Sequence, residues 1–177
     1  MTYYYYGSYG NDYFNYNGND NLVAYGSSGY DTIYGNYYAD YINGESGNDW
    51  LNGYTGSDTL VGGTGSDVLI GYGGTVGEYD VLWGDTGYDY GDLGYDTFVL
   101  GDTYWGAYYQ GAGHATIMDW NSYYDTIQLS GYGSQYSLVY ENWSGTSSLD
   151  TAIYYGNDLI GVVQDTTAVY THDFQFV

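Results

Sequence analysis

Aspartate is the residue type whose number and spacing in this chain best support chemistry. Five aspartates follow one another at a strict step of nine residues: Asp31, Asp40, Asp49, Asp58 and Asp67. The chain has 22 Asp and Glu but no Lys or Arg, so no basic side chain can balance these carboxylates. Flexible coordination by about six to eight oxygen atoms suits Ca²⁺ better than Mg²⁺. The pattern therefore predicts that several calcium ions bind along the repeat.

The aspartates belong to a nine-residue unit that also fixes glycine and aliphatic positions. A glycine opens each unit five residues before the aspartate, four of the five units have a second glycine three places later, and an aliphatic residue follows the aspartate by two places. A helix does not tolerate this much glycine, whereas turns need it. The turn glycines are Gly26, Gly29, Gly35, Gly44, Gly47, Gly53, Gly56, Gly62 and Gly65.

Nine residues accommodate a six-residue turn and a three-residue strand, with the middle strand residue pointing inward. Two units then make one coil, so Asp31, Asp49 and Asp67 line one edge of the stack. Asp40 and Asp58 line the other edge. Carboxylates stacked at a strand spacing of about 4.8 Å repel each other. Bound cations are needed to relieve that repulsion.

Looser copies of the unit flank the regular block. GSYGNDYF (7–14) and GNDNLV (18–23) precede it, and GEYDVLW (77–83), GDTGYDY (84–90) and GDLGYDTFV (91–99) follow it. These copies supply further candidate metal ligands at Asp12, Asp20, Asp80, Asp89 and Asp96.

The repeat resembles the RTX family of bacterial secreted proteins, whose calcium-binding nonapeptide reads GGxGxDxUx. GGTGSDVLI (62–70) fits every position, whereas GNYYADYIN (35–43) has Tyr38 at the place of the second glycine, so we expect its turn to differ. The resemblance implies an all-β fold, a right-handed parallel β-roll or β-solenoid with a C-terminal antiparallel β cap. It also implies that each aspartate is a Ca²⁺ ligand, together with backbone carbonyls of the turn glycines.

The chain divides by texture near residue 100. We expect residues 1–100 to form the calcium-binding β-roll and residues 101–177 to form an antiparallel cap or assembly segment. DFQFV (173–177) is similar to the uncleaved C-terminal signals of type I secretion. Since residues 1–10 have no basic or apolar leader pattern, we expect secretion to the cell exterior or surface without an N-terminal signal peptide.

Composition excludes several other functions. Without Lys or Arg the chain has no means of binding nucleic acid or anionic membranes, and it has no apolar run long enough for membrane insertion. His114 and His172 lie 58 residues apart and are expected to be ordinary surface histidines. The aspartates of the first half are explained by the repeat, so we expect no catalytic residues and no enzyme. The alternative of an active site in the C-terminal segment stays open.

The leading hypothesis is a non-enzymatic, calcium-stabilised extracellular structural protein that folds on binding Ca²⁺ after secretion. A short repetitive chain with 22% aromatic residues favours self-association into a homo-oligomer or polymer, such as a filament, sheath or surface layer. Tyrosines expected on the surface are Tyr30, Tyr37, Tyr38, Tyr41 and Tyr54. The alternative is the C-terminal secretion and folding domain of a larger secreted hydrolase or toxin.

Overall fold

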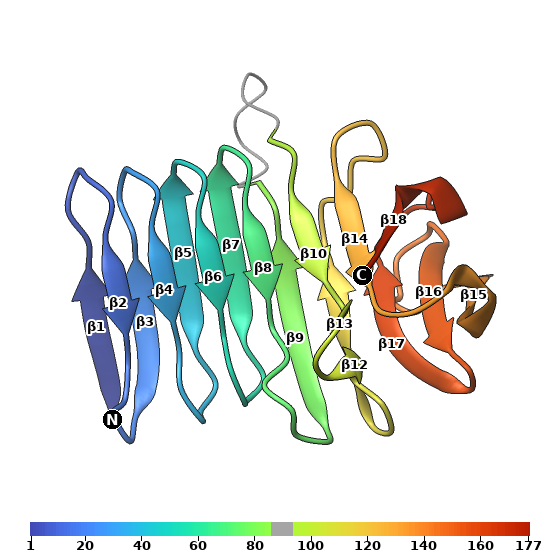
Figure 1. Ribbon diagram of the computed structural model, residues 1–177, viewed down its shortest axis with the longest axis horizontal. Helices are drawn as coiled ribbons and strands as arrows, with labels where there is room; N and C mark the ends of the chain where they lie inside the picture. The colour runs from blue at the N-terminus through green and yellow to red at the C-terminus, as the bar shows by residue number, and fades with distance from the viewer. Residues whose placement is uncertain (86–93) are drawn as a thin grey trace.

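The structure, a computed structural model, describes residues 1–85 and 94–177, in which strands follow one another along one long axis (Figure 1). These strands form two large sheets and a third of two strands. In these ranges one sheet has nine strands, in the order β1 (Thr2–Tyr6), β3 (Asn21–Tyr25), β5 (Tyr41–Ser46), β7 (Thr59–Thr64), β9 (Glu78–Trp83), β13 (Gly113–Ile117), β17 (Asp158–Val163), β16 (Asp150–Tyr155) and β15 (Tyr136–Glu141). The other has seven, in the order β18 (Phe174–Phe176), β14 (Thr126–Leu129), β10 (Thr97–Val99), β8 (Val68–Ile70), β6 (Trp50–Asn52), β4 (Thr32–Tyr34) and β2 (Tyr13–Asn15).

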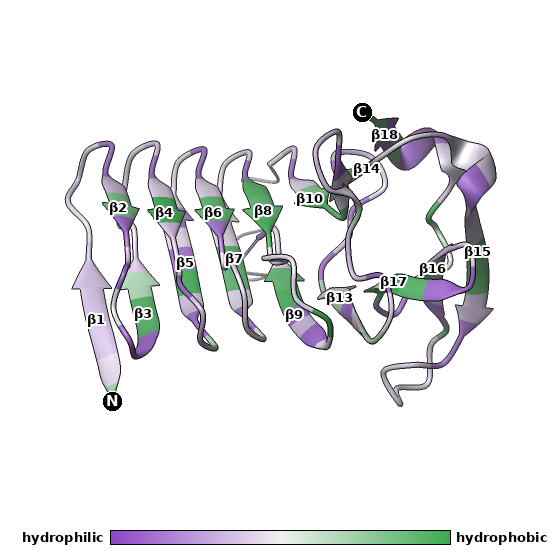
Figure 2. Ribbon diagram, turned by 60° about the horizontal axis from the view of Figure 1, so that its bottom comes forward, coloured by the Kyte–Doolittle hydropathy of each residue, from purple (hydrophilic) through white to green (hydrophobic). Residues whose placement is uncertain are grey.

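Consecutive strands alternate between the two sheets, so the first half of the chain is a parallel coil, as the nine-residue unit predicts. Ile33 of β4 pairs with Leu51 of β6, and Leu51 pairs with Leu69 of β8, which gives eighteen residues per coil. These side chains are fully buried, and the hydrophobic colour recurs along β4, β6 and β8 in Figure 2. Burying one such side chain contributes about 1.5–3 kcal/mol, so the repeated aliphatic position builds the core.

The parallel coil continues beyond residue 100, further than the sequence led us to expect. β13 pairs in parallel with β9, and β14 pairs in parallel with β10 and β18. Among the described strands, antiparallel pairing is confined to β15, β16 and β17 and to the short hairpin of β11 (Gly101–Asp102) and β12 (Gly106–Ala107). The reason is local, because strands such as β14 keep the pattern of an inward aliphatic residue after an aspartate. Two short 3₁₀ turns, η1 (Gly133–Gln135) and η2 (Thr171–Asp173), complete the elements.

The turns show where the repeat needs a left-handed backbone. In four units the second and fourth residues both have positive φ. These residues are Ser27 (85°), Gly29 (130°), Glu45 (71°), Gly47 (135°), Tyr54 (67°), Gly56 (134°), Gly63 (115°) and Gly65 (121°). Asn36 and Tyr38 are not among the positive-φ residues, so the turn of unit 35–43 does differ, as expected.

Glu45 offers a test of this backbone requirement. A non-glycine residue in the left-handed region costs about 1–2 kcal/mol. Glycine avoids this strain, but its greater loss of conformational entropy on folding costs about 0.5–1 kcal/mol. We expect Glu45→Gly to raise the free energy of unfolding in calcium by about 0.5–1 kcal/mol, as measured by urea titration. Glu45→Gln is the control, since it removes the charge but keeps the strain. A Gly variant no more stable than the Gln variant would contradict this reading.

Candidate metal centre

The aspartates form two rows, one along each edge of the coil. The long row consists of Asp12, Asp31, Asp49, Asp67, Asp96 and Asp125. In it, the backbone N–H of each aspartate donates to Oδ1 of the next, at distances from 2.7 Å at Asp31 to 3.2 Å at Asp125. The short row consists of Asp40, Asp58 and Asp80, joined by the same bonds at 2.8 Å. The rows therefore confirm the predicted alternation between edges.

One oxygen of most central carboxylates has no donor. The Oδ2 atoms of five row aspartates are buried and have no hydrogen-bond partner among the described residues: Asp31, Asp49, Asp58, Asp67 and Asp96. Each of these side chains is at most 2% exposed. A buried acceptor without a donor is costly, and a buried anion more so. These atoms mark the positions at which a cation would be most stabilising.

The glycine that opens each nine-residue unit has no side chain and so leaves room beside these oxygens. A Cβ on Gly26 would lie 2.7 Å from the carbonyl oxygen of Gly44 in the next coil, and closer still to Oδ2 of Asp31. A Cβ on Gly44 would likewise lie 2.7 Å from the carbonyl oxygen of Gly62 and against Oδ2 of Asp49. A carboxylate and a main-chain carbonyl thus converge on one small space, and these are the oxygen ligands that Ca²⁺ takes.

The described residues contain no group of three or more His, Asp or Glu side chains that could hold a metal ion. An ion in these rows would therefore draw several of its ligands from the turn carbonyls, as hard oxygen donors. Gly44, Gly53 and Gly62 direct their carbonyls at the glycine of the preceding coil in this way. Gly47 and Gly65 serve a different purpose, since a Cβ on either would collide with the backbone of the coil before it.

Burial disfavours the ionised form of the row aspartates. Desolvation is the main cause, and it raises the pKa of Asp49 to about 6, of Asp67 to about 7 and of Asp96 to about 8. Desolvation also raises the pKa of Asp58, to about 10, and the nearby acids Asp80, Asp40 and Glu78 raise it further. Backbone hydrogen bonds oppose these shifts without cancelling them. Burial therefore opposes ionisation along the rows, and a cation bound between the carboxylates would favour their charged form.

The outer predicted ligands differ from the central ones. Asp12 lies in the long row, and its Oδ2 accepts the N–H of Ser8 at 2.5 Å. Asp20, also predicted to be a metal ligand, lies outside the short row. Leu22 takes the row position and donates to Asp40 at 2.7 Å, while Asp20 pairs with the amino group of Met1 at 3.3 Å. The physical reason is register, since Asp20 comes two residues too early for strand β3.

Two further predicted positions need separate mention. Asp80 lies in the short row, but its Oδ2 accepts the hydroxyl of Tyr109 at 2.5 Å. Asp89 lies within residues 86–93, outside the described residues. Asp125 was not among the predicted ligands, yet it ends the long row, and burial raises its pKa to about 7. Its signal was available, because Asp125-Thr126-Ile127 repeats the pattern of Asp31-Thr32-Ile33.

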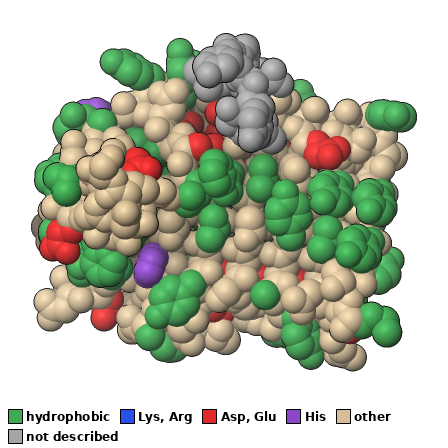
Figure 3. Space-filling model, turned by 180° about the vertical axis from the view of Figure 1, so that it is seen from behind, with side chains coloured by type: hydrophobic (Ala, Val, Ile, Leu, Met, Phe, Trp, Pro, Cys, Tyr) green, Lys and Arg blue, Asp and Glu red, His purple; other side chains and the backbone are tan. Residues whose placement is uncertain are grey.

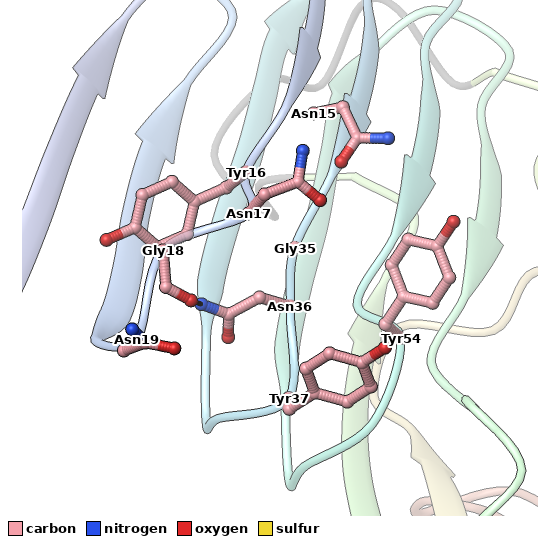
Figure 4. A pocket seen from close by; sticks show the side chains of 9 residues that line it. All are labelled: Asn15, Tyr16, Asn17, Gly18, Asn19, Gly35, Asn36, Tyr37 and Tyr54. Carbon is pink, nitrogen blue, oxygen red and sulfur yellow. Dashed lines mark hydrogen bonds between the residues drawn. The ribbon is translucent and has the colours of Figure 1, made fainter.

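The irregular unit 35–43 closes its own end of the short row. The N–H of Asn36 donates to Oδ2 of Asp40 at 2.7 Å, and its side-chain amide donates to the carbonyls of Gly18 at 3.0 Å and Asp20 at 2.8 Å. Asn36 thereby forms part of the wall of a hollow of about 200 Å³ lined by Asn, Gly and Tyr residues (Figure 4). Here a protein donor satisfies the Oδ2 atom of Asp40, whereas the Oδ2 atom of the next aspartate in the row, Asp58, has no donor among the described residues.

Comparison with known protein families agrees with this geometry. The family described as the RTX calcium-binding nonapeptide repeat (4 copies) matches residues 25–60 and residues 52–75 of the chain. No curated protein matches the chain significantly. Repeats of this family bind Ca²⁺ and occur in proteins that are typically secreted. No helix in residues 1–85 and 94–177 is long and apolar enough to cross a membrane. Residues 25–75, which hold the centre of both rows, therefore belong to the family of RTX calcium-binding nonapeptide repeats.

Proposed function

We propose that this chain is a non-enzymatic extracellular structural protein whose two sheets close when Ca²⁺ enters the aspartate rows after secretion. The observation that supports this function is the set of five buried Oδ2 atoms that no donor satisfies within the described residues. Each lies in a row of like charges, in a chain with a formal charge of −22.

The energetics favour folding outside the cell. At a tenfold excess of calcium over Kd, one site contributes about 1.4 kcal/mol, so five sites contribute about 7 kcal/mol. That sum is comparable to the whole stability of a typical domain, about 5–15 kcal/mol. Extracellular calcium modules have Kd values of about 10⁻⁴–10⁻³ M. The chain would thus remain unfolded at cytosolic calcium, in a state suited to passage through a secretion channel.

Calcium titration of the full chain tests this function. Starting from EDTA at neutral pH, we expect the far-ultraviolet circular dichroism signal of β-structure to appear cooperatively as calcium approaches millimolar concentrations. Magnesium at the same concentration is the control and should be less effective, because it requires stricter octahedral geometry. Identical β spectra in EDTA and in calcium would overturn the proposal.

The N-terminal end of the coil supports self-association with a second copy. In the described part of the chain, β1 pairs only with β3 and β2 only with β4, so both sheets end there in open edges. Tyr4 (58% exposed), Tyr6 (70%) and Tyr13 (72%) leave aromatic surface around these edges. Hydrophobic side chains are also spread over the face of the coil in Figure 3. Open strand edges with apolar surface favour pairing with another chain.

Sedimentation velocity in calcium tests this assembly. We expect the protein to associate in a concentration-dependent way and Tyr4→Lys to reduce association, because a charge on an edge strand opposes pairing. Tyr123→Lys is the matched control, since it changes the charge equally at a remote residue that is 88% exposed. Monomers at all concentrations, or equal inhibition by both variants, would contradict assembly through this end.

The same open edges favour a second candidate function, in which the chain is the folding and secretion module of a larger secreted hydrolase or toxin. Preceding coils of a longer polypeptide would continue β1 and β2 with the same register. The mass of the native secreted polypeptide on a denaturing gel distinguishes this function from assembly of separate copies.

A further inference from the structure

We propose that the hydroxyl of Tyr109 replaces a calcium ion at Asp80, so that the short row ends in a hydrogen bond and Asp80 is not a metal ligand. This inference rests on the proposed calcium binding. It concerns one end of one row and departs from the repeat pattern, in which every row aspartate would be a ligand.

The two oxygens of Asp80 are both satisfied by the protein. Oδ1 accepts the N–H of Asp58 at 2.8 Å, and Oδ2 accepts the Tyr109 hydroxyl at 2.5 Å. Both partners of the second bond are only 1% exposed. Oδ2 of Asp58, one coil earlier, has no such partner among the described residues. At Asp80 the Tyr109 hydroxyl therefore already stabilises the oxygen that would otherwise need an ion.

The glycine beside Asp80 lies as close to its carboxylate as the glycine beside Asp58 does, although Gly71 precedes Asp80 by nine residues and Gly53 precedes Asp58 by five. A Cβ on Gly71 would lie 2.7 Å from Cγ of Asp80, and a Cβ on Gly53 would lie 2.7 Å from Cγ of Asp58. The cradle between glycine and carboxylate is therefore the same in both coils. The phenol of Tyr109 is a donor that Asp80 has and that Asp58 lacks among the described residues.

The next coil offers no acid with which to extend the row. Asp40, Asp58 and Asp80 occupy the same position in three successive coils. In the coil after Asp80, that position is occupied by Ala115 of β13. Nearby Glu78 is also satisfied, since its oxygens accept the N–H groups of Gly73 at 3.0 Å and Thr75 at 3.1 Å. A last carboxylate with full hydrogen bonding has the least need of a cation, because its charge is already stabilised by donors.

Packing fixes Tyr109 in this role. Its ring lies 5.0 Å from that of Tyr72, and its backbone has a φ of 54°. A bulky residue in the left-handed region is strained and persists where surrounding contacts determine it. Tyr108, the adjacent residue, directs its hydroxyl elsewhere, to Asp102 at 3.0 Å. The chain thus contains a matched pair of tyrosines, of which one reaches an aspartate row.

Counting bound calcium by native mass spectrometry tests the inference on the full chain. We expect Asp58→Asn to bind one ion fewer than the unaltered protein and Asp80→Asn to bind the same number. Loss of an ion in Asp80→Asn would overturn the inference while leaving calcium binding intact. Absence of calcium from the unaltered protein would instead overturn the proposed function.

Tyr109→Phe gives a second, independent readout. The variant leaves Oδ2 of Asp80 without a donor, so folding should couple to one additional ion. The dependence of the logarithm of the unfolding constant on the logarithm of calcium concentration should become steeper by about one ion. Tyr108→Phe is the control and should keep the original dependence. An unchanged dependence in Tyr109→Phe would contradict the role of the hydroxyl.

Discussion

In a chelator, the metal-free protein should become less stable as the pH rises from about 4 to about 8. The row aspartates have pKa values raised by burial, to about 7 for Asp67 and about 8 for Asp96. In the unfolded chain they titrate near about 3.9. Between these values the folded state holds protons that the unfolded state has released, so raising the pH favours unfolding. The stabilisation is complete below the unfolded pKa and is lost as the pH passes the folded values.

Urea or thermal unfolding in EDTA at several pH values measures this effect. Below pH 7 the metal-free protein should regain the β signal that it lacks at higher pH. The calcium-saturated protein is the control and should show the opposite trend, because protons compete with the metal for carboxylates. Metal-free stability that stays constant or rises across this range would show that the aspartates are not buried as the rows require.

The effect of Asp67→Asn on stability should have opposite signs in calcium and in EDTA. Asparagine keeps an oxygen to accept the N–H of Asp49, a bond of 2.7 Å in the structure, but it removes the charge. In a tenfold excess of calcium over Kd, the loss of one ion should cost about 1.4 kcal/mol. That loss corresponds to about 3–6 °C in the unfolding midpoint for a chain of this size. In EDTA the variant should keep its β signal to a higher pH than the unaltered protein does, since it removes a buried anion.

The matched control for this prediction is Glu141→Gln. Glu141 is exposed at the far end of the molecule, in β15, so the variant makes the same change of charge outside both rows. Its stability should change little in either condition. If Asp67→Asn destabilises equally with and without calcium, Asp67 acts only as a hydrogen-bond acceptor and is not part of a metal site.

The sequence by itself was sufficient for the coil and for the centre of both rows. Glycine, aspartate and aliphatic residues recur at one short period, so local turn geometry and inward packing repeat without reference to the rest of the chain. Asp31, Asp49 and Asp67 could therefore be placed on one edge from spacing alone. The difference of the turn containing Tyr38 also followed from local chemistry, since Tyr38 stands where the other four units have a glycine with positive φ.

Beyond the strict repeat, strand register decided what spacing could not. Asp20 has the local neighbours of a repeat aspartate, yet Leu22 occupies its expected position because β3 pairs with β5 in another register. Asp125 follows Asp96 by 29 residues, and only the parallel pairing of β14 with β10 brings it into the long row. Insertions between strands change the spacing in sequence without changing the stacking of coils.

The ends of the short row depended on tertiary structure. Tyr109 is 29 residues from Asp80 in sequence, and no repeat pattern relates the two. Asn36 closes the opposite end through carbonyls of the preceding coil. A periodic sequence specifies the interior of a stack, where each coil meets a copy of itself. The ends are set by long-range contacts, because there the coil meets residues that do not repeat.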